Sequence, residues 1–186
     1  MAERPLRLGT RGSALALAQA TLVAKALGGA QVVPIKTSDK APDVGGDKAR
    51  FVREIERALL EDEVDLGVHS AKDLPTELPE GLELAGVPER EDPRDAFIGH
   101  VDSLGEVPEG SRIGTSSLRR RAQILARRPD LEVVELRGNV DTRFARYEAG
   151  DFDGLVLAMA GLRRLGRAEE IAFAIEPDDG VPAPTR

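Results

Sequence analysis

Residues 6–35, which read LRLGTRGSALALAQATLVAKALGGAQVVPI, decide the fold class of this chain. The alternating stretch 6–9, which reads LRLG, predicts a strand, and Ser13 stands at the N-cap position of a helix over 14–27. A Gly-Gly pair ends that helix, and residues 31–35 predict a second strand. Strand, helix and strand in this order are typical of an α/β fold with largely parallel sheets.

The same alternation continues outward from this stretch. We expect a mobile polar loop over 37–50, a helix from Phe51 to about Glu61, a strand over 65–68 and another near 83–87. The charged segment 89–95 is interpreted as an interdomain hinge, with an ordinary solvated turn as the alternative.

Beyond this segment the pattern restarts and predicts a second α/β unit over about 99–170. Its expected strands are 112–115, 131–136 and 154–158, and its expected helices are 117–128, 139–148 and 161–165. The proline-containing end, 171–186, is interpreted as a connector.

Composition excludes several classes of site. The chain has 186 residues, no cysteine and two histidines, which excludes disulfides, thiolate metal sites and a cysteine nucleophile and leaves little for a histidine-rich metal site. We therefore predict no bound metal. The N-terminus lacks the features of a secretory signal, and no apolar run is long enough to span a membrane. These features predict a cytoplasmic protein with no membrane partner.

The charge pattern narrows the range of possible ligands. A net charge of −7 and only 3% aromatic residues argue against nucleic acid, and the phosphate-binding glycine motifs of nucleotide sites are missing. All twelve basic residues of 99–170 are arginine, whose planar fork matches carboxylates and phosphates. A bias from GC-rich coding or thermal adaptation is the alternative explanation.

Four predicted strand-to-helix junctions place small residues beside arginine: 10–13, 114–120, 137–143 and 158–164. Each would gather backbone N–H groups, a helix N-terminus and a guanidinium, which together can bind an anion. A single Ser or Thr in such a place is more often only a helix cap. Four junctions in one chain favour a small ligand with several carboxylates.

Lys72 and Asp73 differ from the other candidates, because they follow the predicted strand 65–68 and include an acid. Among cationic neighbours, Asp73 would stay ionised and could stabilise a positive charge on a substrate. A surface pair or a turn cap is the alternative. His69 is predicted to point the other way and to be structural.

At these residues the sequence resembles the porphobilinogen deaminase family, also called hydroxymethylbilane synthases. The resemblance rests on LGTRGSALALAQA (8–20), VHSAKDLPTELPEGL (68–82), EREDPRDAFIG (89–99), GTSSLRRRAQ (114–123), RPDLEVVELRGNVDTR (128–143) and LAMAGLRRLG (157–166). It extends from about Arg7 to Pro184.

The resemblance implies a transferase that joins four porphobilinogen units head to tail, releasing ammonia at each step, to give the linear tetrapyrrole hydroxymethylbilane for haem and other porphyrins. It implies two lobes with the topology of type II periplasmic binding proteins around a central cleft. Domain 1 would comprise 1–98 with 171–186, and domain 2 would comprise 99–170. A third domain would carry a dipyrromethane cofactor on a cysteine thioether.

On matching positions, Asp73 would be the catalytic carboxylate that stabilises the azafulvene-like cation left when ammonia departs. The residues expected to bind cofactor and substrate are Arg11, Ser13, Lys72, Thr115, Ser116, Ser117, Arg119, Arg120, Arg137, Gly138, Asn139, Arg143 and Arg164. Phe51 would cover the cleft from the loop, with Lys48 nearby.

Three departures from the family follow. The chain stops before the third domain and its cofactor cysteine, so we expect turnover to need that domain, which a separate chain could supply. We expect a monomer otherwise. Thr37-Ser38-Asp39 and 48–51 lack glycines common in the family, which affects how the loop would close. The alternative function is a non-enzymatic two-lobe binding module for an anionic small molecule.

Overall fold

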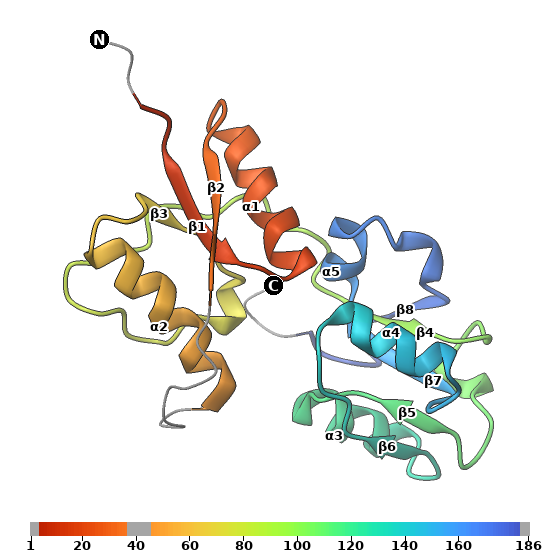
Figure 1. Cartoon of the computed structure of the whole chain (residues 1–186). Coiled ribbons are helices and arrows are strands. Elements are labelled where there is room, and N and C mark those ends of the chain that lie inside the picture. Colours follow the sequence, from red (N-terminus) through yellow and green to blue (C-terminus); the bar gives the residue numbers. More distant parts are fainter. Residues whose placement is uncertain (1–3, 37–45, 183–186) are drawn as a thin grey trace. The chain divides into compact units, whose positions relative to one another are not determined.

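The computed structural model describes residues 4–36 and 46–182, and the side chains of 46–51 lie outside this description. Its contacts divide the chain into two units, one ending at Glu89 and the other beginning at Arg90 (Figure 1). We call them unit 1 and unit 2.

Unit 1 is a three-stranded parallel sheet with two helices. Its elements are β1 (Arg7–Arg11), α1 (Ala14–Ala26), β2 (Gln31–Ile35), α2 (Gly46–Leu60), β3 (Leu66–Gly67) and a 3-10 turn over Ala71–Asp73. The strand order is β2-β1-β3, so the first strand lies in the middle. The carboxyl ends of β1 and β3 therefore lie at the same edge of the sheet.

Local chemistry explains the boundaries of α1. The Ser13 side chain accepts a hydrogen bond from the backbone N–H of Ala16, as an N-cap does. Gly28 and Gly29 follow the helix with φ of 76° and 110°, values that glycine adopts at little cost. The sequence prediction of this βαβ unit is confirmed.

Unit 2 contains a larger, mixed sheet. Its strands are β4 (Asp95–Ile98), β5 (Arg112–Gly114), β6 (Glu132–Val134), β7 (Gly154–Ala158) and β8 (Phe173–Ile175), in the order β6-β5-β7-β4-β8. Its helices are α3 (Leu118–Arg127), α4 (Val140–Glu148) and α5 (Met159–Arg164), with 3-10 turns over Leu104–Glu106 and Ala168–Glu170. β5 pairs in parallel with β6 and β7, whereas β4 is antiparallel to β7 and β8.

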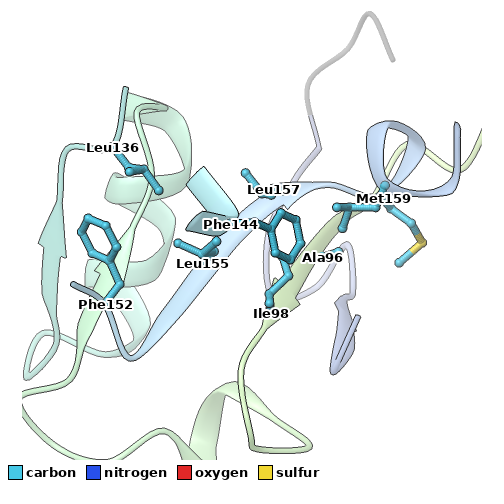
Figure 2. Close-up of a cluster of buried hydrophobic side chains, with 9 residues drawn as sticks. Ala96, Ile98, Leu136, Phe144, Phe152, Leu155, Leu157 and Met159 are labelled. Atoms are coloured by element: carbon cyan, nitrogen blue, oxygen red, sulfur yellow. The ribbon is translucent and has the colours of Figure 1, made fainter. Parts of the chain in front are cut away.

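Two hydrophobic clusters cover the two faces of this sheet. Successive residues of β7 alternate between them, with Leu155 and Leu157 in one cluster and Val156 in the other. The first cluster includes Phe144 of α4, and Figure 2 shows it gathered around β7. The second includes Ile124 of α3. The helices therefore lie on opposite faces, each burying its apolar side.

The predicted α/β fold class is confirmed, but two details of the predicted secondary structure are wrong. α2 begins at Gly46, inside the stretch predicted as a loop. The strand expected near 83–87 is absent from the described residues, and Leu84 and Val87 there are 63% and 75% exposed. Without a neighbouring strand, an apolar run has no ladder to join. The expected mobility of 37–45 lies outside the described residues.

The predicted domain boundaries also differ from the structure. β4, expected in domain 1, and β8, expected in a connector returning to domain 1, pair with each other in the sheet of unit 2. The boundary falls at 89/90 and not at 98/99. Both strands are short and apolar, and only their pairing with each other and with β7 shows where they belong.

Candidate functional site

Most of the predicted ligand-binding residues of unit 2 follow the carboxyl ends of three parallel strands. β5, β6 and β7 run in parallel, so the loops after them lie at one edge of the sheet. These loops lead into α3, α4 and α5 and include Thr115, Ser116, Ser117, Arg137, Gly138 and Asn139. The carboxyl edge of a parallel sheet is the usual position for a ligand.

Arg143 joins two of these loops. Its Nη2 donates to Ser116 Oγ at 3.0 Å, and its Nε donates to the carbonyl oxygen of Gly138 at 3.0 Å. Burial lowers the pKa of the Arg143 guanidinium. Within residues 4–36 and 52–182, no carboxylate forms an ion pair with it. A partly buried cation held this way favours an anionic ligand.

Three of the predicted ligand contacts also shape the loops. Ser117 and Asn139 are the N-caps of α3 and α4, and they accept from the N–H groups of Arg120 and Thr142. Thr115 is 3% exposed, and its Oγ1 accepts from the N–H of Ser117. Because the caps use the side chains, the free backbone N–H groups of the first helical turns become the donors available to a ligand.

Arg137 and Arg164 stand farther out. Arg137 pairs with Glu135 through Nε and Oε1 at 2.9 Å, and both side chains are exposed. Such a pair is weak in water and can be exchanged for a ligand carboxylate. Arg164 is the last residue of α5, a helix turn beyond the strand end.

Arg119 and Arg120 are both held by one carboxylate, that of Asp95. Arg119 Nη2 lies 2.6 Å from Oδ2, and Arg120 Nη2 lies 2.9 Å from Oδ1. Sequence reasoning assigned Asp95 only to the hinge segment and missed this contact. A lone acid at the start of an otherwise apolar strand, DAFI, was the available signal.

Unit 1 has its own group of candidates at the carboxyl edge of β1 and β3. Arg11 ends β1, Ser13 caps α1, and Lys72 and Asp73 lie in the 3-10 turn that follows β3. Ser70 Oγ lies 3.0 Å from Gln19 Oε1 and links this turn to α1. The sheet therefore brings these residues to one edge, as the sequence predicted.

His69 lies among these residues and is partly buried. Its burial lowers its pKa, while Asp73 raises it and Arg11 lowers it. Both charges are thus close enough to act on the imidazole. The ring packs over β3, since a Cβ on Gly67 would lie 3.3 Å from His69 Nε2. The structural role and the orientation predicted for His69 stay predictions.

Some predictions cannot be placed. Lys48 and Phe51 belong to α2 by their backbone, but their side chains lie outside the described residues. A cavity of about 400 Å³ lies along α2, lined by Glu56 and Pro79 among others, and contains none of the predicted site residues.

Two further features concern metal ions and membranes, in the part of the chain that the structure describes. There, His, Asp and Glu side chains do not form a group of three able to hold a metal ion. Helices within the same residues are all too short or too polar to cross a bilayer.

Comparison with known proteins gives a consistent result. The family model described as "Porphobilinogen deaminase, dipyromethane cofactor binding domain" matches residues 6–186. A porphobilinogen deaminase from Caulobacter sp. (strain K31) is 50% identical over 204 residues, covering 99% of this chain and 64% of the relative. That from Caulobacter vibrioides (strain NA1000 / CB15N) is 50% identical over 203 residues, covering 97% and 63%. The chain therefore spans less than two thirds of the length of these curated relatives.

Among solved structures, an ancestral arginine-binding protein bound to glutamine is a weak match, with a TM-score of 0.40 and 16% identity over 97% of this chain and 77% of that one. The family model and the curated relatives each cover nearly the whole chain. This chain belongs to the porphobilinogen deaminase family.

Proposed function

We propose that this chain supplies the substrate-binding and catalytic residues of a hydroxymethylbilane synthase, which joins four porphobilinogen units and releases ammonia at each step. The observation that carries the proposal is the guanidinium of Arg143, held between Ser116 and Gly138 at the carboxyl edge of a parallel sheet. Its desolvation is offset by no ion pair within the described residues, and a ligand carboxylate would offset it.

The remaining residues fit the same ligand. Each porphobilinogen carries two carboxylates, so a growing chain needs many cationic and N–H donors. Unit 2 supplies Arg119, Arg137 and the first turns of α3 and α4. Unit 1 supplies Arg11 and Lys72.

Asp73 has the opposite charge and a different role. When the C–N bond to the amine breaks and ammonia leaves, positive charge remains on the pyrrole that loses it. A fixed carboxylate stabilises that charge while the new carbon–carbon bond forms and the attacked ring loses its proton. Arg11, Ser13 and Lys72 would hold acidic groups of the substrate around it.

The family implies a dipyrromethane cofactor, and the donors described here fit its acidic side chains. Arg119, Arg143 and the backbone N–H groups at the helix starts would hold those carboxylates. The 186 residues contain no cysteine, so none of them can form the thioether that attaches this group. We propose that a cysteine-bearing third domain, in a separate chain or a longer one, completes the enzyme in the cytoplasm.

A binding experiment tests the site. Porphobilinogen should raise the melting temperature of the purified chain, and Arg143→Gln should abolish the shift. Arg146→Gln is the matched control, because Arg146 lies on the same helix but pairs with Asp151. Absence of a shift in the unmodified chain, or an unchanged shift in Arg143→Gln, would contradict the carboxylate assignment.

An activity experiment tests the chemistry. The chain is incubated with porphobilinogen and a cysteine-bearing third domain, and uroporphyrin is measured. Asp73→Ala should abolish turnover and retain substrate binding. An effect of Asp73→Ala on affinity alone would favour a non-enzymatic binding module. Uroporphyrin formed without any added domain would show that the chain needs no third domain.

A further inference from the structure

The carboxylate of Asp95 lies beneath the start of α3 and is almost completely buried. Its side chain is 3% exposed, and it accepts from two consecutive arginines, Arg119 and Arg120, one on each oxygen. A buried carboxylate between two guanidiniums is held in one geometry, and it holds them in return.

The two arginines are not equivalent. Arg120 is 6% exposed, and its Nη1 also donates to the Val156 carbonyl oxygen on β7 at 2.9 Å. The adjoining cavity has a volume of about 10 Å³, room for about one water molecule. The Arg119 side chain is 26% exposed. Arg119 is therefore the member of the pair that reaches solvent.

A count of donors shows what Arg119 can still bind. A guanidinium has five N–H groups. Arg119 uses one on Asp95, one on Gln123 Oε1 and one on the Val181 carbonyl oxygen, which leaves two for a ligand. Two N–H groups on a fixed fork suit a carboxylate.

We propose that Asp95 is a positioning residue for ligand recognition, fixing the guanidinium of Arg119 so that its two remaining N–H groups meet a substrate carboxylate. Arg120 anchors Asp95 to β7 through the Val156 carbonyl. Gln123 and the segment after β8 complete the hold on Arg119. The inference rests on the proposed function, because it takes the ligand to be a pyrrole carboxylate.

The test uses the whole chain and four variants: Asp95→Asn, Arg119→Gln, their double mutant and the control Asp130→Asn. Asp130 is matched because it also pairs with an arginine of unit 2, Arg128, but it contacts neither Arg119 nor Arg120. Porphobilinogen affinity is measured by calorimetry. We expect Asp95→Asn to lose about tenfold in affinity, an effect that largely disappears in the Arg119→Gln background. Asp130→Asn should bind like the unmodified chain.

A second measurement is independent of the ligand. In the free protein, the Arg119 Nη groups should give resolved NMR signals, since three hydrogen bonds stop their rotation, and Asp95→Asn should make these signals collapse by exchange. Resolved signals that persist in Asp95→Asn would overturn the positioning role, even if the chain binds no porphobilinogen. The positioning role would be overturned as well if the losses of affinity in Asp95→Asn and Arg119→Gln simply add in the double mutant. Absence of binding by the unmodified chain would instead count against the proposed function, with the NMR result still deciding the role of Asp95.

Discussion

Units 1 and 2 build their sheets from the same arrangement of three parallel strands. In unit 1 the middle strand β1 carries Leu8-Gly9-Thr10, and in unit 2 β5 leads through Ile113-Gly114-Thr115. Thr10 and Thr115 are both buried, and in both units a serine then caps the next helix. The difference is that unit 2 adds the antiparallel strands β4 and β8 beside β7.

The added strands change both packing and charge. β4 extends the sheet by one buried strand, and its first residue, Asp95, holds the two arginines of α3. In unit 1 the sheet stops at β3, and the carboxyl edge instead carries Lys72 and Asp73 on a short turn. One arrangement of strands thus supports an arginine-rich anion site in one unit and a site with a carboxylate in the other.

The largest expected effect concerns the packing that β4 provides. Phe97 is 1% exposed and stacks on Phe173 with centroids 4.9 Å apart, so Phe97→Ala should destabilise unit 2 by about 3–5 kcal/mol. Leu8→Ala in unit 1 should cost about 2–3 kcal/mol, since its smaller sheet can relax more. Urea unfolding, monitored by hydrogen exchange of the backbone amides in β7 and in β1, measures the free energy of unfolding of unit 2 and of unit 1. A larger loss for Leu8→Ala would contradict the comparison.

The glycines of the two middle strands provide the next comparison. A Cβ on Gly114 would lie 2.8 Å from Leu155 Cδ2 and 2.9 Å from Leu136 Cδ2, so Gly114→Ala should cost about 1–3 kcal/mol. The three atoms nearest to a Cβ on Gly9 all belong to Val64, with Cγ2 at 2.9 Å, so one side chain can move aside and Gly9→Ala should cost less. Thermal melts of both variants show which one loses more stability. Equal losses of melting temperature would show that the two glycines have similar surroundings.

A pH effect is expected in unit 1. Burial lowers the pKa of His69 below its usual 6.5, so the folded state binds fewer protons than the unfolded state between the two values. The free energy of unfolding therefore rises with pH through that window, and it falls as the pH drops below about 6.5. His69→Gln should flatten this dependence in unit 1, as measured by urea midpoints from pH 5 to 8. An unchanged slope would contradict the burial of a neutral imidazole.

The smallest effect should be the same in both units. Ser13→Ala and Ser117→Ala each remove an N-cap hydrogen bond and should cost about 0.5–1 kcal/mol. Ser103 precedes a 3-10 turn and makes no such cap bond, so Ser103→Ala should leave the melting temperature unchanged. A large difference between Ser13→Ala and Ser117→Ala would indicate that one hydroxyl has a further role.

Much of the fold could be predicted because local signals decide it. The helix α1 begins after Ser13, as cap chemistry predicted. The helices α3 and α4 begin after Ser117 and Asn139, one residue later than the predicted helices 117–128 and 139–148. The strand 154–158 was predicted to the residue. β4 and β8 were missed, because a strand of three or four residues is defined by its partners more than by its own pattern.

The candidate site divides in the same way, into features that local sequence predicts and features that long-range contacts decide. Residue types and spacing identified the loops 114–120 and 137–143 and the pair Lys72 and Asp73 as anion and catalytic candidates. They could not show that Arg143 joins two loops or that Arg120 is buried on Asp95. The contacts of Arg143 with Ser116 and of Arg120 with Asp95 connect residues 27 and 25 positions apart, across different elements.

By itself, the sequence determined the α/β alternation, the helix caps and the arginine-rich strand ends, because capping, periodicity and charge act over a few neighbouring residues. Only the tertiary structure decided which unit β4 and β8 join, and which arginines reach solvent and which are buried. Those outcomes depend on the partners that each strand and side chain finds at long range, and a local pattern does not contain them.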